Sequence, residues 1–324
     1  MNILVSPRVA RAYGARIRKL DPRAKLIVPA IRDGALTWSG DVAAADVCCF
    51  SEDLWQEPEL RRMVLPVVFR LERLKWFHTF SAGVDSPVFQ LLIDRGTMLT
   101  NSSGASAASI AQYVLAMMLH RVKRVGEWRE QQSRHEWQQL QAGELTGQTA
   151  GIIGTGAIGG EVARLAQAFG MRVLGIRRSD RPAKHVDEQL PMRRLHYLLK
   201  QSDYVVLACP LTKETERLIG EPELRAMKPD ATLINVARGR VVDEAALIRA
   251  LEEGWIGGAC LDVFEQEPLP ESSPLWSMPN VVVTPHNSGF SPLNMERSMA
   301  IFLDNLDRLV NKRKLKNRVL SAGA

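Results

Sequence analysis

Short apolar runs alternate with longer amphipathic stretches along most of the chain, a pattern that is typical of α/β proteins with parallel sheets. In the first hundred residues four such runs alternate with polar helical stretches: 3–5, 26–28, 47–50 and 76–79. Six further runs follow later in the chain: 150–153, 172–176, 204–208, 231–236, 258–264 and 281–284. The pattern predicts an α/β fold in which the first hundred residues form a small unit of their own and the later runs form a second parallel sheet.

Three other segments have distinct patterns. Residues 102–125 are apolar over much of the circumference of a helix, and such helices are buried, here between domains or subunits. Met117 and Met118 in this helix are expected to be core residues. The polar, Trp- and Gln-rich segment 127–145 is expected to form an arm, and residues 292–309 a helix that returns to the first unit.

The segment 149–179 has the pattern of a strand, a glycine-rich turn, a helix and a second strand. Its turn is Gly154-Thr155-Gly156-Ala157-Ile158-Gly159. In such a turn the first glycine permits a tight bend, the second lets backbone amides approach a pyrophosphate, and the third lets the helix pack closely on the strand. An ordinary glycine-rich loop would have the same composition, but the flanking strand and helix favour a dinucleotide-binding site.

The residues after the second strand indicate which dinucleotide binds. An NAD site usually has Asp or Glu here, which accepts a hydrogen bond from the ribose 2′-hydroxyl. This chain has Arg177, Arg178 and Ser179 instead, which can bind a 2′-phosphate but offer no carboxylate to a bare ribose. We therefore expect NADP(H) to be preferred and NAD(H) to remain possible. The alternative is that the arginines belong to a solvated loop.

Composition excludes several other classes of protein. The 324 residues are 46% hydrophobic and 24% charged, as in ordinary globular proteins with room for two domains. We find no apolar run of signal-peptide or transmembrane length, and we expect a cytoplasmic protein that does not bind membranes. The four cysteines lie in apolar runs and lack the spacing of metal ligands, so no metal site is expected.

The net charge of +6 and the basic segment 311–318 are compatible with nucleic-acid binding. The alternative, which we favour, is a solvated last helix with cations near its C-terminus. Part of the excess charge would also suit anionic ligands such as NADP and 2-oxo acids. We expect no nucleic-acid partner.

Three side chains with catalytic potential follow three of the predicted strands. Arg238, Glu267 and His286 each lie within a few residues of the carboxyl end of a strand. Ligands of open α/β sheets bind at that edge, where the glycine turn and Arg177 are also expected. Taken singly, the three residues would suit a turn, a surface charge and a cap, but their coincidence at one edge favours an active site.

Reduction of a 2-oxo acid requires a proton donor and a group that holds the carboxylate. His286 is the natural donor, because a neighbouring carboxylate such as Glu267 keeps an imidazole protonated and oriented. Arg238 can bind the carboxylate and polarise the carbonyl oxygen with its planar guanidinium. The small-residue loop 81–85, after an apolar run, would suit a carboxylate through its backbone amides or serve as a plain turn.

Six motifs resemble those of the D-isomer-specific 2-hydroxyacid dehydrogenases: SAGVD at 81–85, GIIGTGAIG at 151–159, PLTKET at 210–215, NVARG at 235–239, LDVFEQEPL at 261–269 and TPH at 284–286. The resemblance implies that Arg238, Glu267 and His286 are catalytic. It implies that Ala82 and Gly83 hold the substrate carboxylate through their amides. It further implies that four residues belong to the cofactor site: Pro210, Thr215, Val236 and Asp262. Of these, Thr215 would lie near the pyrophosphate and Asp262 near the nicotinamide.

The same resemblance implies two Rossmann-like domains with parallel sheets. A discontinuous, flavodoxin-like substrate-binding domain would comprise residues 1–101 and 288–324, and a doubly wound dinucleotide-binding domain residues 102–287. The family also implies a homodimer formed through the long helix and the arm after it.

Departures from the common family pattern indicate which branch of the family the chain resembles. Arg177 replaces an acidic residue, as in the NADPH-dependent glyoxylate and hydroxypyruvate reductases that the chain resembles. Formate dehydrogenases have glutamine at the position of Glu267, so this residue argues against that branch. The expected reaction is the reduction of a 2-oxo acid to the D-2-hydroxy acid. The alternative is a nucleotide-gated binding protein of the corepressor type, to which the basic tail and the tryptophans would point. An L-specific dehydrogenase would have its glycine turn near the N-terminus, unlike Gly154.

Overall fold

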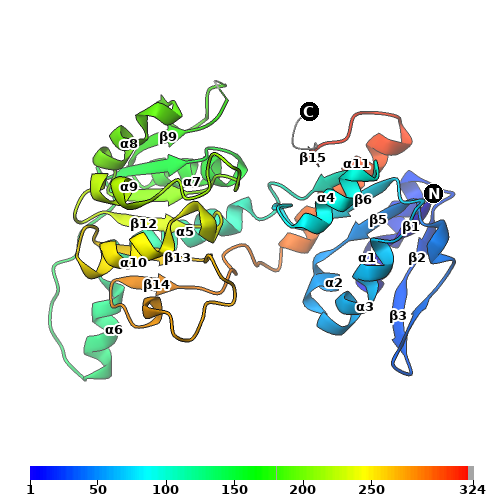
Figure 1. Ribbon diagram of the computed structural model, residues 1–324, viewed down its shortest axis with the longest axis horizontal. Coiled ribbons are helices and arrows are strands. Elements are labelled where there is room, and N and C mark those ends of the chain that lie inside the picture. Colours follow the sequence, from blue (N-terminus) through cyan, green and yellow to red (C-terminus); the bar gives the residue numbers. More distant parts are fainter. Residues whose placement is uncertain (180, 320–324) are drawn as a thin grey trace. The chain divides into compact units, whose positions relative to one another are not determined.

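The computed structural model describes residues 1–179 and 181–319, which fold into two α/β units (Figure 1). Unit 1 comprises residues 1–106 and the chain from Ser291 onward, and unit 2 comprises Ala107–Phe290. The two points where the chain passes from one unit to the other lie a few residues after the domain boundaries expected from the sequence. The first is later because the Ser102 amide donates to the Ser81 carbonyl of unit 1 at 3.0 Å.

Unit 1 has a six-stranded sheet in the order β15-β7-β6-β5-β1-β2, parallel except for β15. Its strands are β1 Asn2–Leu4, β2 Lys25–Ile27, β5 Val47–Phe50, β6 Trp76–Thr79, β7 Met98–Asn101 and β15 Arg318–Val319. A separate antiparallel hairpin consists of β3 Pro29–Arg32 and β4 Ala35–Trp38. The helices are α1 Pro7–Leu20, α2 Glu52–Gln56, α3 Pro58–Val68, α4 Pro87–Asp94 and α11 Asn294–Val310.

Apolar side chains cover both faces of this sheet. On one face Ile3 and Trp76 pack with α1 and α11, and the ring of Trp76 stacks on Phe302 at a centroid distance of 5.1 Å. On the other face Leu4 and Phe77 pack with the helices α2 to α4. The C-terminal helix is thus part of the core of the unit that the N-terminus begins.

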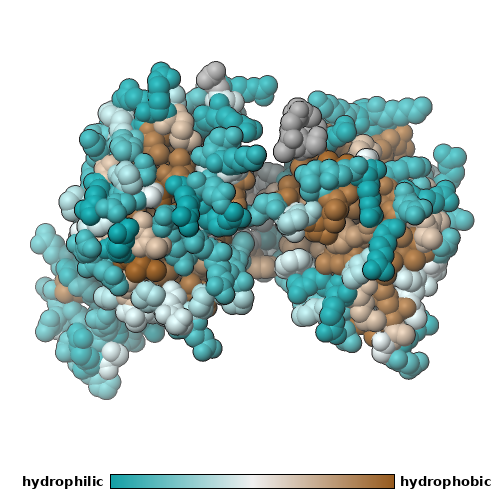
Figure 2. Space-filling model, viewed as in Figure 1, coloured by the Kyte–Doolittle hydropathy of each residue, from teal (hydrophilic) through white to brown (hydrophobic). Residues whose placement is uncertain are grey.

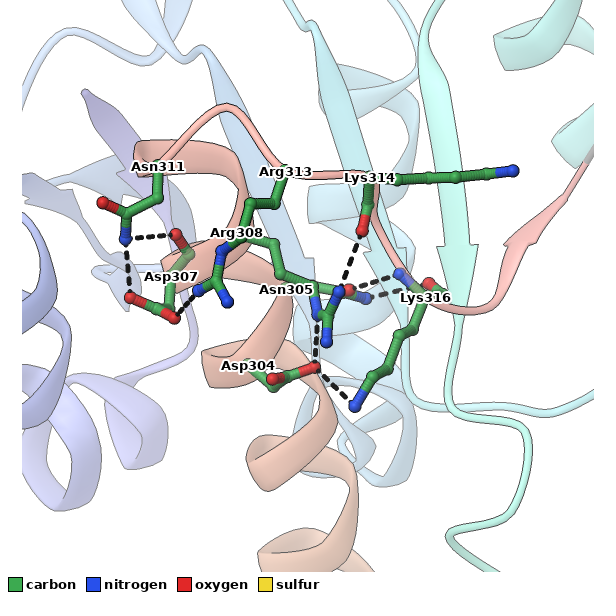
Figure 3. A network of polar contacts seen from close by, with 8 residues as sticks. All are labelled: Asp304, Asn305, Asp307, Arg308, Asn311, Arg313, Lys314 and Lys316. Atoms are coloured by element: carbon green, nitrogen blue, oxygen red, sulfur yellow. Dashed lines mark hydrogen bonds and ion pairs between the residues drawn. The ribbon is translucent and has the colours of Figure 1, made fainter.

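Two cations of the basic segment that follows α11 pair with acidic side chains of that helix (Figure 3). Asp304 accepts a hydrogen bond from Arg308 at 2.8 Å and lies 3.2 Å from the ammonium group of Lys316. Asp307 pairs with Arg313. Arg308 belongs to α11 itself, so two of the five cations in the segment 311–318 are partly neutralised in this way. The expectation of a solvated helix end rather than a nucleic-acid-binding tail stays a prediction.

Unit 2 has a seven-stranded parallel sheet in the order β10-β9-β8-β11-β12-β13-β14. Its strands are β8 Thr149–Ile153, β9 Arg172–Ile176, β10 Glu188–Leu190, β11 Tyr204–Leu207, β12 Thr232–Asn235, β13 Gly258–Leu261 and β14 Val281–Val283. Its helices are α5 Ala107–Val122, α6 Val125–Ser133, α7 Ala157–Ala168, α8 Leu195–Gln201, α9 Glu221–Ala226 and α10 Glu244–Glu252. The order is that of a doubly wound sheet, so the predicted α/β fold class is confirmed.

Helices cover both faces of this sheet. Apolar residues of α5 and α7 form one core layer with β8 and β11, and residues of α8, α9 and α10 form the other. The helix that the sequence predicts over 102–125 is shorter in the structure, where it is α5. Its apolar face packs on α7 within unit 2. It ends because Arg124 adopts a left-handed conformation (φ 57°), and α6 then begins at Val125 and runs into the predicted arm 127–145.

Polar side chains cover most of the molecular surface seen in Figure 2, with the larger apolar areas on unit 1. Among residues 1–179 and 181–319, we find no helix that is both long and apolar enough to cross a membrane. All four cysteines are buried and free, and burial raises the pKa of Cys209 to about 11.

Candidate active site

The glycine turn between β8 and α7 has the three-glycine geometry expected of a nucleotide-binding loop. Gly154 has φ 101°, and a Cβ there would lie 2.5 Å from the backbone nitrogen of Cys209. A Cβ on Gly159 would lie 2.1 Å from the carbonyl oxygen of Gly154. At Gly156, by contrast, a Cβ would lie more than 4 Å from every neighbouring atom of residues 1–179 and 181–319. The first and third glycines are needed for packing, and the second leaves open space above the backbone.

This open space has the properties of a pyrophosphate site. Among the described residues no side chain caps the N-terminus of α7, so the first-turn amides at Ala157 and Ile158 are available to an anion. The buried Oγ1 of Thr155 has no hydrogen-bond partner in the described part of the chain. Such an orphaned hydroxyl is typical of a site that a ligand completes. The residues of the loop therefore fit a dinucleotide.

Arg177 directly follows β9, at the same edge of the sheet as the glycine turn. It is half-buried, and its Nη1 donates to the carbonyl oxygen of Arg181 at 3.3 Å. Arg178 and Ser179 are exposed. Two guanidinium groups and a hydroxyl thus lie where an NAD site would have a carboxylate.

The loop after β11 lies against the glycine turn, since Cys209 contacts Gly154. Thr215 closes this loop: its Oγ1 donates to the carbonyl oxygen of Pro210 at 2.6 Å and accepts from the amide of Thr212 at 2.8 Å. Val236, directly after β12, is buried. The predicted pyrophosphate contact of Thr215 stays a prediction, because its hydroxyl is used within the loop.

His286 and Glu267 form the centre of the site. The Nδ1 atom of His286 lies 2.8 Å from Oε2 of Glu267, and the imidazole is half exposed. The hydrogen bond to Glu267 raises the pKa of His286, against the opposing effects of burial and of Arg238. Burial favours a higher pKa for Glu267, but hydrogen bonds from His286 and from the Phe264 amide outweigh it, so the pKa of Glu267 is lowered. Because an ionised carboxylate only accepts, Nδ1 carries the hydrogen and Nε2 remains for substrate.

Arg238 lies in the turn after β12 and is half-buried. Asn235 shapes this turn, accepting from the Ala237 amide at 3.0 Å and donating to the Arg238 carbonyl oxygen at 3.0 Å. A Cβ on Gly239 would lie 1.8 Å from the carbonyl carbon of Phe264, so the turn packs directly on the loop that leads to Glu267. The structure therefore brings Arg238, Glu267 and His286 together at one edge of the sheet.

Asp262 is buried and bonded to the loop after β14, and its expected place near the nicotinamide stays a prediction. It is 1% exposed, and its carboxylate accepts hydrogen bonds from Thr284 at 2.6 Å and from the Asn287 amide at 3.0 Å, as well as from Ser288. These partners, together with Tyr113 of α5, belong to the site but were not found by sequence reasoning. The only available signal was the motif spacing around 284–286, since a tyrosine in a buried helix has no catalytic signature of its own.

Ala82 and Gly83 belong to unit 1, in the loop after β6. Both of their carbonyl oxygens are occupied: Asn101 donates to Ala82 at 2.6 Å and Ser81 donates to Gly83 at 2.8 Å. We find no acceptor for the amides of these two residues within the described ranges. This arrangement suits an anion, although these residues lie in a different unit from His286.

The described residues contain no group of three His, Cys, Asp or Glu side chains arranged to hold a metal ion. The site that they do form is a nucleotide loop beside a histidine–glutamate pair and an arginine. This combination is that of a nicotinamide-dependent dehydrogenase.

Comparison with known proteins decides the family. The NAD-binding domain of the D-isomer specific 2-hydroxyacid dehydrogenases matches residues 115–288, more than half of the chain. The chain belongs to this family. Members of the family are NAD(P)-dependent oxidoreductases, as the sequence motifs indicated.

Three relatives of this dehydrogenase family illustrate the likeness. The chain is 41% identical over 223 residues to a glyoxylate reductase of Thermococcus gammatolerans, a match that covers 66% of each sequence. A D-isomer specific 2-hydroxyacid dehydrogenase of Xanthobacter autotrophicus Py2, solved with NADPH and MES, is 27% identical with a TM-score of 0.79, covering 98% of this chain and 97% of that one. An NADPH-dependent glyoxylate/hydroxypyruvate reductase of Sinorhizobium meliloti, solved with NADP and sulfate, is 25% identical with a TM-score of 0.77 and the same coverage.

Proposed function

We propose that the protein is an NADPH-dependent reductase of a 2-oxo acid of the glyoxylate or hydroxypyruvate type, with the D-2-hydroxy acid as product. The observation that carries the proposal is the pair formed by His286 and Glu267, 2.8 Å apart at the sheet edge that also holds the glycine turn. Glyoxylate reductase relatives support the substrate class.

The roles of the residues follow from their chemistry. NADPH would be held by the glycine turn and would supply the hydride to the carbonyl carbon. His286 gives the proton on Nε2 to the carbonyl oxygen, and Glu267 keeps the imidazole protonated and in one orientation. Arg238 binds the carboxylate and polarises the carbonyl, and the free amides of Ala82 and Gly83 hold the carboxylate from unit 1.

The preference for NADPH rests on Arg177 and Arg178. A guanidinium binds a phosphate through paired charge-assisted hydrogen bonds, whereas a ribose hydroxyl gains little from it. Relatives solved with NADPH and with NADP support this assignment. We also propose that NAD(H) is accepted more weakly.

In this proposal the two units bind different ligands. Unit 2 binds the dinucleotide and unit 1, discontinuous in sequence, binds the substrate. We further propose a cytoplasmic homodimer. Trp128 of α6 is 43% exposed and Trp137 in the segment after it is 98% exposed, so the arm offers apolar surface to a second copy.

Initial rates with glyoxylate, hydroxypyruvate, pyruvate and phenylpyruvate, each with NADPH and with NADH, test the proposal. We expect turnover that prefers NADPH and falls by about a hundredfold or more in His286→Ala, since general acid catalysis contributes about 10²–10⁴-fold. Arg177→Asp should weaken the preference for NADPH, whereas Arg172→Ser, at the opposite end of the same strand, should not. A wild-type protein that binds NADPH but reduces none of the four acids would instead indicate a nucleotide-gated binding protein.

A further inference from the structure

The loop 284–288 holds His286 in a backbone conformation that the residue does not favour. His286 has φ 52°, in the left-handed region where Cβ disfavours residues other than glycine. Its amide donates to the backbone oxygen of Asp262 at 2.8 Å. Because such a conformation persists only where neighbouring contacts enforce it, the contacts of this loop determine where the imidazole points.

The carboxylate of Asp262 makes the first set of these contacts. Its Oδ1 accepts from Thr284 Oγ1 at 2.6 Å and from the Asn287 amide at 3.0 Å. The amide of Ser288 lies 3.1 Å from both oxygens, and the Ser288 hydroxyl donates to Oδ2. All of these donors belong to loop 284–288. Since a carboxylate offers about four lone-pair sites, little capacity remains for a further donor such as a nicotinamide carboxamide.

Helix α5 makes the second set of contacts, from two residues on one face. Ser109 Oγ donates to the carbonyl oxygen of Ser288 at 3.0 Å, and Tyr113 Oη lies 2.9 Å from Thr284 Oγ1. Residues four apart in a helix lie on the same side, so both side chains reach the loop together. Thr284 donates its single hydroxyl hydrogen to Asp262, and therefore Tyr113 must be the donor to Thr284. Burial raises the pKa of Tyr113, so this hydroxyl stays protonated at neutral pH.

We propose that Ser109 and Tyr113 are positioning residues, which fasten loop 284–288 to α5 and thereby fix the orientation of His286 toward Glu267 and substrate. The proposal rests on the reductase function proposed above and gives α5 a part in the reaction. Neither residue lies in the glycine turn or beside Arg177, where the pyrophosphate and the 2′-phosphate would bind, so we expect the helix to act mainly on the proton donor.

The consequence of this arrangement is a loss of kcat without a loss of cofactor affinity. A proton donor displaced by about 1 Å can cost up to about a hundredfold in rate. Removing a hydroxyl from each anchor should leave the loop only partly held by Asp262, and we expect kcat to fall about tenfold. The dissociation constant for NADPH should stay within about twofold, because the glycine turn is unchanged.

The test compares Tyr113→Phe, Ser109→Ala and the double variant with Tyr204→Phe. Tyr204 is a matched control: it is 4% exposed, and its hydroxyl also bonds α5, at the carbonyl oxygen of Met118. Within the described chain we find no hydrogen bond from this hydroxyl to the loop. Steady-state rates, NADPH fluorescence titration and thermal melting are measured for each. A lower kcat at unchanged NADPH affinity, in the Tyr113 and Ser109 variants but not in the control, is the expected result. Tyr113→Phe alone keeps the ring packing and remains informative if the double variant does not fold.

A second measurement does not depend on turnover. The pKa of His286 is followed by NMR in the protein without cofactor, where Glu267, Arg238 and Asp262 are the charged groups that face the imidazole. A loosened loop weakens the hydrogen bond to Glu267, so the pKa of His286 should fall in the double variant and stay unchanged in Tyr204→Phe.

The outcomes distinguish the positioning role of Ser109 and Tyr113 from the proposed reductase function. If the wild-type protein reduces no 2-oxo acid but the pKa of His286 falls as expected, the reductase function is wrong and the positioning of the histidine stands. Unchanged kcat and unchanged pKa in the double variant would overturn the positioning role. Loss of NADPH affinity in Tyr113→Phe would also overturn it, since the tyrosine would then act on the cofactor site.

Discussion

Single residues set the protonation states on which the proposed reaction depends. The bond between His286 and Glu267 raises the pKa of the imidazole and helps lower that of the carboxylate, so each favours the charged form of the other. Reduction needs the protonated imidazole. The rate of reduction should therefore be sustained below the raised pKa of His286 and be lost as the pH rises through it.

Glu267→Gln tests this dependence. The amide keeps the size of the side chain but removes the negative charge, so the main cause of the raised pKa is lost while burial and Arg238 still lower it. We expect the alkaline limb of the pH profile for kcat/KM to move to lower pH, with at least about a tenfold loss of reductase activity at pH 8. Glu265→Gln, an exposed neighbour, is the control. A profile that does not move would show that Glu267 does not set the protonation of His286.

At the scale of secondary-structure elements, the turn between β8 and α7 assigns a different task to each glycine. Gly159 is a packing residue, because its Cβ would be 2.1 Å from the carbonyl oxygen of Gly154. Gly156 lies at open space, and no neighbouring atom in the described chain requires a glycine there. The approach of a pyrophosphate to the backbone would explain its small size.

Alanine at these two glycines should therefore have opposite effects. Gly156→Ala should melt within a few degrees of the wild-type protein, yet bind NADPH at least about tenfold more weakly, because the methyl group occupies the space of the pyrophosphate. Gly159→Ala should lower the melting temperature by several degrees, since the overlap costs about 1–3 kcal/mol. Thermal melting and fluorescence titration measure the two effects. Equal NADPH affinity in Gly156→Ala and the wild type would argue against binding at this turn.

Strands with an apolar run were predictable, and strands without one were not. The strands β5, β6 and β9 have the bounds that their apolar runs indicate. The strands β10 and β15 have only three and two residues and begin with polar side chains, so they form no apolar run. The end of α5 was also missed, because it depends on the left-handed conformation of Arg124.

At the scale of the whole molecule, the chain completes unit 1 only with its last segment. Phe302 and Leu306 of α11 are fully buried in the core of unit 1, and Asn305 bonds the backbone of Lys316 so that the chain leads on to β15. Ser298 of α11 also lies 2.7 Å from the hydroxyl of Ser102. Unit 2, in contrast, is continuous in sequence.

A chain that ends at Phe290 should therefore lose one unit and keep the other. Each large apolar side chain withdrawn from the core of unit 1 removes about 1.5–3 kcal/mol, so the loss of α11 exceeds the stability of a small domain. We expect unit 1 to become sensitive to protease, while NADPH affinity stays within about threefold of that of the full chain and reductase activity is lost. A protease-resistant unit 1 in the shortened chain, or lost NADPH binding, would contradict this division of labour.

The sequence by itself determined the α/β class, the nucleotide-binding turn and the family, because these depend on local periodicity and on short motifs with fixed spacing. It also named Arg238, Glu267 and His286, since strand ends of a parallel sheet meet at one edge. Only the tertiary structure decided how Asp262 is used and that Ser109 and Tyr113 reach the histidine loop. These contacts join residues that lie far apart in the chain, such as Ser109 and Ser288. Hydrogen bonds of this kind leave no periodic signal in a single sequence.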